Sequence, residues 1–140
     1  MSTISDKIIL DTHIWLWLME GEERLVRTHK LPALEQAAAN SRLIISVMTI
    51  WEISMLDVKK RIRLPMPIDA WVKEAISKTK VLVDQISLEV AIDSNNLPGD
   101  FHGDPADRLI VSTARLLDAR LATADREILK YAKQGYVKVL

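Results

Sequence analysis

Short apolar, β-rich runs alternate with longer helical patterns along this chain of 140 residues, and this alternation restricts the fold more than any other feature. The runs lack the polar alternation of a half-solvated strand, so they predict strands that are covered on both faces. They lie at residues 7–10, 43–47, 81–86, 120–123 and 137–140. Strands that alternate with helices pair in parallel through right-handed crossovers, with helices on both sides of the sheet. We therefore expect an α/β fold: a three-layer α/β/α domain with a central, mostly parallel twisted sheet of about five strands.

The helical patterns between these runs are typical of amphipathic helices. We expect helices at residues 12–19, 31–40, 48–62, 68–78, 87–95, 105–119 and 125–133. The clearest is the third, in which apolar side chains recur at spacings of three and four and form one stripe. That stripe contains Met48, Trp51, Met55, Val58 and Ile62.

Composition excludes several classes of protein. The chain has 19 basic and 19 acidic residues, so its total charge favours neither general DNA packaging nor a membrane surface. It has no cysteine, which excludes disulfides and thiolate metal sites and fits a reducing compartment. The densest apolar run, residues 14–19, is far too short to span a bilayer. We expect one domain over residues 1–140, located in the cytoplasm and without membrane contact.

Four acidic residues map to the carboxyl edge of the predicted sheet, where ligands of such folds usually bind. Asp11 follows the first strand, and Glu52 lies in the first turns of the helix after the second. Asp107 opens the long late helix, and Asp125 follows the strand at residues 120–123. If these side chains converge to about 4 Å, each pair repels by roughly 4 kcal/mol at an effective dielectric of 20. Clustered carboxylates without thiolates therefore predict a site for Mg²⁺ or Mn²⁺.

Each acid also has a purely structural explanation as part of a helix cap. Asp11 directly precedes a predicted helix, Asp125 is the first residue of another, and Thr49 with Glu52 matches the T-x-x-E capping box. In "DPAD", Asp104 is a natural N-cap, and the second aspartate faces the positive end of the helix dipole. Because Ser, Thr and Asn cap comparably well, four acids exceed what capping demands. A non-catalytic α/β binding module whose acids are helix caps stays open as the alternative.

Four sequence blocks resemble, in order and spacing, those of PIN-domain ribonucleases of the VapC toxin type. The blocks are "LDTHIWLW", "SVMTIWEIS", "LPGDFHGDPADRLIVSTA" and "LATADREI". The resemblance covers residues 8–139, and the DPxDR block with its apolar helix is the most specific part. It implies a metal-dependent endoribonuclease that cleaves single-stranded segments of RNA. It also implies a homodimer that is restrained by a small VapB-like antitoxin.

The same resemblance implies roles for individual residues. Asp11, Glu52 and Asp107 match the family's catalytic metal-site acids, and Asp125 matches the fourth, less uniform one. Asp104 is then left to the helix cap or to a supporting position behind the metal ligands. Two neighbours depart from the family pattern in ways that would alter the pocket wall. A larger polar residue is common where Gly103 stands, and an aromatic is frequent where Ala106 stands.

Several other residues are weaker candidates for a role in the site or in binding RNA or a partner. Thr12, Ser46 and Thr123 are placed where hydroxyl groups could orient the carboxylates by hydrogen bonds. Arg108, Arg126 and the basic cluster at residues 59–63 could follow an RNA phosphate backbone, although solvated helix faces explain them equally. Aromatic side chains at helical spacing belong to a core or interface more often than to a base-stacking platform. The four tryptophans are Trp15, Trp17, Trp51 and Trp71, of which the first two are also candidate contacts for an antitoxin or a second protomer.

A phosphotransfer or phosphatase domain of α/β type is a third interpretation. Such a domain would normally place its nucleophilic aspartate in a D-x-D or paired-acid context after the first strand. In "LDTHIW" the position two residues after Asp11 is His13, so that context is absent.

Overall fold

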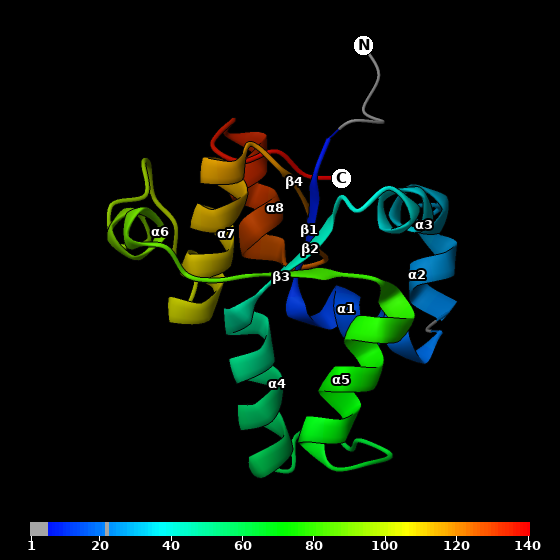
Figure 1. Ribbon diagram of the computed structural model, residues 1–140. Helices are drawn as coiled ribbons and strands as arrows, with labels where there is room; N and C mark the ends of the chain where they lie inside the picture. The colour runs from blue at the N-terminus through cyan, green and yellow to red at the C-terminus, as the bar shows by residue number, and fades with distance from the viewer. Residues whose placement is uncertain (1–5, 22) are drawn as a thin grey trace.

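The computed structural model describes residues 6–21 and 23–140, in which helices flank a four-stranded sheet (Figure 1). The elements are β1 (Ile8–Leu10), α1 (Thr12–Glu20), α2 (Glu23–Arg27), α3 (Leu31–Ala39), β2 (Leu43–Ser46), α4 (Val47–Val58), α5 (Ile68–Thr79), β3 (Leu82–Asp84), α6 (Leu88–Asp93), α7 (Pro105–Leu117), β4 (Arg120–Ala122) and α8 (Arg126–Lys133). The strand order is β3-β2-β1-β4, and all three pairs are parallel. The predicted α/β architecture is confirmed.

The alternation of side chains along β1 explains why helices cover both faces of the sheet. Ile8 and Leu10 point into one apolar cluster, and Ile9, between them, points into the other. The first cluster contains buried residues of α1, α2, α3, α4 and α5, and the second contains those of α7 and α8. Figure 1 shows α7 and α8 on one side of the strands and α1, α2 and α3 on the other. A strand with no solvated face is what the continuous apolar run predicts.

Two of the tryptophans form part of the first cluster. The rings of Trp15 and Trp71 meet edge to face with centroids 5.4 Å apart, and both side chains are buried. The indole Nε1 of Trp15 donates a hydrogen bond to Thr79 Oγ1 at 2.9 Å, so its polar atom is satisfied inside the core. Trp15 is therefore not available to a partner, which corrects the expectation that it is a contact residue.

Several boundaries differ from the sequence prediction. The run at residues 137–140 makes a single parallel bridge between Leu121 and Val139, so the described chain has four strands. The third predicted helix ends at Val58, and α2 is an additional short helix that the pattern did not indicate. Among the described residues, no helix has both the length and the apolar character needed to cross a membrane.

The apolar stripe of α4 is only partly packed against the rest of the molecule. Trp51 is 55% exposed and Val58 is 76% exposed, whereas Thr49 and Ile53 are fully buried. Ile53 packs in the first cluster with the side chains of α1 and α5. The spacing rule identified a stripe of apolar residues, but the fully buried residues of α4, Thr49 and Ile53, lie outside that stripe.

Replacing Ile53 with Ala should lower the free energy of unfolding by about 2–5 kcal/mol, because the change leaves a cavity in the core. Val58→Ala removes a side chain that is 76% exposed and should change this free energy by less than about 0.5 kcal/mol. Chemical denaturation of both variants measures the difference. Equal losses in the two variants would mean that the stripe containing Val58 is packed after all.

Candidate active site

Five carboxylates line one hollow at the carboxyl edge of the sheet. The hollow has a volume of about 300 Å³ and is lined by Asp11, His13, Trp17, Glu52, Asp104, Asp107, Ala124 and Asp125. The structure thus brings together all four acids that the sequence singles out, from four separate regions of the chain. They meet because parallel strands end at the same edge and the helices that follow them begin there.

Asp11 occupies the most restrained position in the hollow. It directly follows β1, caps α1 and is buried. Its Oδ1 accepts a hydrogen bond from the Thr12 backbone N–H at 2.8 Å, and its Oδ2 accepts one from Thr123 Oγ1 at 2.7 Å. Burial raises the pKa of Asp11 above its usual value, these two hydrogen bonds lower it in part, and the negative charge of Asp125 raises it further.

Glu52 does not belong to a capping box. The N-cap of α4 is Ser46, whose side chain accepts a hydrogen bond from the Met48 N–H at 3.0 Å, so Thr49 lies inside the helix. The Oε1 of Glu52 instead accepts a hydrogen bond from Thr12 Oγ1 at 2.5 Å. Burial is the main cause that raises the pKa of Glu52, and the negative charges of Asp11 and Asp104 add to it.

Thr12 therefore holds two acids from two different helices. Its backbone N–H binds Asp11, and its side-chain hydroxyl binds Glu52. The side chain is 1% exposed, so water does not compete for the hydroxyl. The contact fixes the first turn of α1 relative to the second turn of α4, and the separation of the two carboxylates with it.

Asp107 has a carboxylate that no recorded hydrogen bond within the described chain stabilises. Asp104 caps α7 by accepting the Asp107 N–H at 2.9 Å, so capping does not need the Asp107 side chain. Burial raises the pKa of Asp107 to about 7, with additional contributions from the negative charges of Asp104, Asp11, Asp125 and Glu52. Without a cation, this carboxyl group therefore ionises less readily in the folded protein than it does at its ordinary pKa.

Asp125 and Thr123 connect the last strand to the site. Asp125 caps α8 by accepting the Ile128 N–H at 3.0 Å, and its own N–H donates to Thr123 Oγ1 at 3.0 Å. The same Thr123 hydroxyl donates to Asp11, so it joins the loop after β4 to the end of β1. Of the three hydroxyl residues proposed to support the acids, Thr12 and Thr123 contact carboxylates, whereas Ser46 caps α4.

The two arginines proposed for RNA binding have different environments. Arg108 is half-buried, and its guanidinium donates from Nε to Ser94 O at 2.9 Å and from Nη1 to Phe101 O at 2.8 Å. These bonds fasten the loop before α7, which leaves Arg108 little freedom to follow a phosphate. Arg126 is exposed at the start of α8, directly after Asp125.

The departure at Gly103 has a structural reason that sequence reasoning missed. A Cβ at this position would lie 2.4 Å from Phe101 Cε2 and 2.9 Å from Asp107 Cβ. Phe101 is buried and packs against Tyr131 with ring centroids 5.0 Å apart. Glycine therefore lets the ring of Phe101 pass close to the backbone beside Asp107, where it packs in the second apolar cluster behind the hollow.

The donor set of the hollow fits a hard divalent cation. Carboxylate oxygens are the ligands that Mg²⁺ and Mn²⁺ prefer, and no ion pair recorded between described residues involves any of the five acids. In the described chain, no three Asp, Glu or His side chains are arranged to hold one ion directly. Mg²⁺ usually keeps several waters and needs only one or two carboxylates, so water can complete the remaining contacts.

Comparisons with known proteins agree with the motifs. The model of the PIN domain family matches residues 8–134. Ribonuclease VapC22 of Mycobacterium tuberculosis is 31% identical over 121 residues, which cover 86% of this chain and 88% of the relative. The crystal structure of VapBC2 from Rickettsia felis, bound to a promoter DNA fragment, superposes with a TM-score of 0.66 at 19% identity and covers 95% of this chain and 96% of the other. A toxin–antitoxin complex from Klebsiella pneumoniae gives a TM-score of 0.57 at 23% identity, with 87% and 90% covered.

The family match spans the strands and helices that carry all four acids, and the curated relative agrees over most of both chains. The resemblance to VapC-type proteins that the sequence blocks predict is thereby confirmed. This chain belongs to the PIN domain family.

Proposed function

We propose that this protein is a Mg²⁺- or Mn²⁺-dependent endoribonuclease that cleaves single-stranded segments of RNA and acts as the toxin of a toxin–antitoxin pair. The observation that carries the proposal is the crowding of five carboxylates in one hollow, where His13 is the basic side chain of the lining and no described Lys or Arg forms an ion pair with the acids. Membership of the PIN domain family supports it, as does the M. tuberculosis relative, which is a ribonuclease.

Each acid has a proposed role in hydrolysis of the phosphodiester. Asp11 and Asp107 hold the main ion, Glu52 ligates it or accepts a proton from the attacking water, and Asp125 tunes the site or holds a second ion. A bound divalent ion supplies charge neutralisation, activation of water and help for the departing oxygen. The hydrogen bonds to Asp11 keep its oxygens in place while the substrate binds. The raised pKa of Glu52 suits a general base, because a base is most effective when its pKa lies close to the working pH.

The proposed partners are RNA, a VapB-like antitoxin and a second copy of the chain. The K. pneumoniae structure is a toxin–antitoxin complex, which supports an antitoxin here. Trp17 lines the hollow and is half-buried, so an antitoxin segment lying across the site would contact it. For the homodimer, Leu88 and Ile92 of α6 are 73% and 58% exposed and offer an apolar surface.

The non-catalytic binding module is the second candidate, because part of the capping interpretation is correct. Asp11, Asp104 and Asp125 do cap helices. Capping gives no role to the carboxylates of Glu52 and Asp107, however, and both of these have raised pKa values. A module without metal chemistry would gain nothing from keeping them in the hollow. The nuclease therefore explains more of the site.

Asp107→Asn should reduce Mg²⁺-dependent cleavage of single-stranded RNA by more than the 10–100-fold that loss of an outer hydrogen-bond partner typically costs. The matched control is Asp100→Asn, which removes an exposed acid of the loop that leads to α7 and should cleave normally. Gel analysis of the RNA products with and without Mg²⁺ measures both variants. Full activity in Asp107→Asn would remove Asp107 from the proposed site.

The pKa of Asp107 also predicts how metal-free stability depends on pH. Because the folded-state pKa is about 7 against an ordinary value of 3.8, the folded protein binds this proton more tightly than the unfolded chain does. The stabilisation is complete below the ordinary value and is lost as the pH rises through about 7. The asparagine side chain does not titrate, so the Asp107→Asn variant does not lose this stability as the pH rises. Without metal, the variant should therefore melt at a higher temperature than the wild type at pH 8. Its melting temperature should also change less between pH 5 and pH 8. Thermal melts with a chelator check this, and a lower melting temperature at pH 8 would favour a structural role.

Thr12→Val should weaken Mg²⁺ binding by about 10–100-fold, because the methyl group that replaces the hydroxyl cannot hold Glu52. Thr12→Ser keeps the hydroxyl and should restore the affinity to near that of the wild type. Calorimetric Mg²⁺ titration reports the affinity directly, apart from any change in folding stability. If the valine and serine variants bind Mg²⁺ equally, the hydroxyl does not position Glu52.

A further inference from the structure

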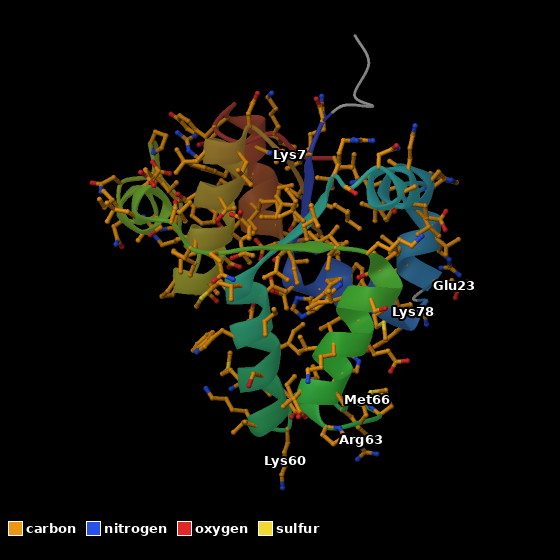
Figure 2. The ribbon with its side chains drawn as sticks, viewed as in Figure 1. Lys7, Glu23, Lys60, Arg63, Met66 and Lys78 are labelled. Atoms are coloured by element: carbon orange, nitrogen blue, oxygen red, sulfur yellow. The ribbon has the colours of Figure 1, made fainter. Side chains whose placement is uncertain are left out.

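A cluster of four exposed cations lies at the end of α4 that is farther from the acidic hollow. The cluster, here called the basic turn, consists of Lys59, Lys60, Arg61 and Arg63, all exposed. Figure 2 shows Lys60 and Arg63 at the lower tip of the molecule, where α4 leads into α5. Among the described residues, no hydrogen bond or ion pair is recorded for these four side chains, so their charges are free to meet a ligand.

The backbone of the basic turn is held in a defined conformation. The Arg61 N–H donates to Leu56 O at 2.9 Å and the Lys60 N–H to Asp57 O at 3.0 Å, which closes the end of α4. Burial then alternates along the chain: Ile62, Leu64 and Met66 pack against the first apolar cluster, and the residues between them face solvent. The inward side chains therefore anchor a segment that presents its cations outward.

The geometry of α4 connects the basic turn to the active site. Lys59 follows Glu52 by seven residues, which is close to two helical turns, so both lie on the same face about 10 Å apart along the axis. Trp51, adjacent to Glu52, is 55% exposed on the same helix. An exposed aromatic ring and a group of cations about two helical turns apart on one helix can bind a single strand together, the ring by stacking a base and the cations by neutralising phosphates.

The charge of the hollow favours a separate cationic surface for binding RNA. Five carboxylates repel the phosphates of RNA, and the net charge of the chain is zero, so attraction must come from local groups of cations. Arg108 is committed to backbone carbonyls and contributes little. Among the described residues, the basic turn is a group of four cations without recorded ion pairs that directly follows a helix carrying a site acid.

We infer that the basic turn binds the phosphate backbone of the RNA substrate a few nucleotides from the scissile bond, with the strand running along α4 and Trp51 beside it. The inference rests on the proposed nuclease function. It names the part of the molecule that supplies affinity, whereas the acidic hollow supplies the chemistry.

The test uses the full-length protein, a chelator and a labelled single-stranded RNA of roughly 12 nucleotides, a length within the range that single-strand sites cover. Without divalent ions the RNA stays intact, so its dissociation constant can be measured over a series of salt concentrations. The variant Lys60→Gln/Arg63→Gln removes two charges from the basic turn. Lys78→Gln/Lys133→Gln is the matched control, since Lys78 lies near the opposite end of α5 (Figure 2) and Lys133 ends α8.

Loss of two phosphate contacts should reduce the slope of log affinity against log salt by about 1.4, because each contact on a single strand contributes about 0.7. The control pair should keep the wild-type slope. With Mg²⁺, the basic-turn variant should show a raised KM and an unchanged kcat, because its acids are intact. A second pair, Lys59→Gln/Arg61→Gln, gives an independent measurement of the same slope.

The inference is overturned if both basic-turn pairs bind RNA with the slope and affinity of the control. It is also overturned if they lose binding of poly-glutamate, a probe for an acidic protein partner, while RNA binding stays unchanged. Cleavage by the wild type in Mg²⁺ tests the proposed function separately. If RNA binding depends on the basic turn but the wild type cleaves no RNA, the proposed nuclease function is wrong and the RNA-binding role of the basic turn is retained.

Discussion

Negative charge gathered in one hollow, with no ion pair to a described Lys or Arg, is the constraint on which this structure depends. Parallel pairing of the strands gathers the acids at one edge, and burial raises the pKa values of Asp11, Glu52 and Asp107. The groups recorded in contact with these carboxylates are hydroxyl and amide donors, which orient an anion without neutralising it. The fold thereby leaves the negative charge of the hollow without an ion pair inside the described chain.

Helix capping and the proposed chemistry are complementary at this edge. Asp104 and Asp125 satisfy the first N–H groups of α7 and α8. Because Asp104 caps α7, the carboxylate of Asp107 is not needed as a cap for its own helix. Ser46 has the same effect in α4, where its cap leaves Glu52 free to reach Thr12. Asp11, Asp104 and Asp125 are therefore helix caps that also line the hollow, whereas Glu52 and Asp107 line it without capping a helix.

The sequence predicted what depends on local pattern and missed what depends on packing. Apolar runs identified all four strands of the described chain, although only β1 and β2 are buried throughout and Leu82 of the edge strand β3 is 51% exposed. The spacing in α4 located an apolar face, but spacing cannot tell which side of a helix other elements will cover, and Trp51 and Val58 proved exposed. The predicted capping box failed because the helix begins at Val47, directly after β2, and Ser46 caps it. Thr12 was correctly predicted to orient a carboxylate, but its partner Glu52 lies 40 positions away and follows from the docking of α1 beside α4, which no local motif encodes.

The direct passage of β2 into α4 has a consequence for how such a protein can change. Ser46 ends the strand and Val47 begins the helix, so the two elements share a rigid joint with no spare residue. One extra residue early in α4 would turn everything after it by about 100° and carry Glu52 away from Thr12. Insertions and deletions should be tolerated in the surface connections. The number of residues between β2 and Glu52, in contrast, cannot change without moving Glu52 out of the hollow.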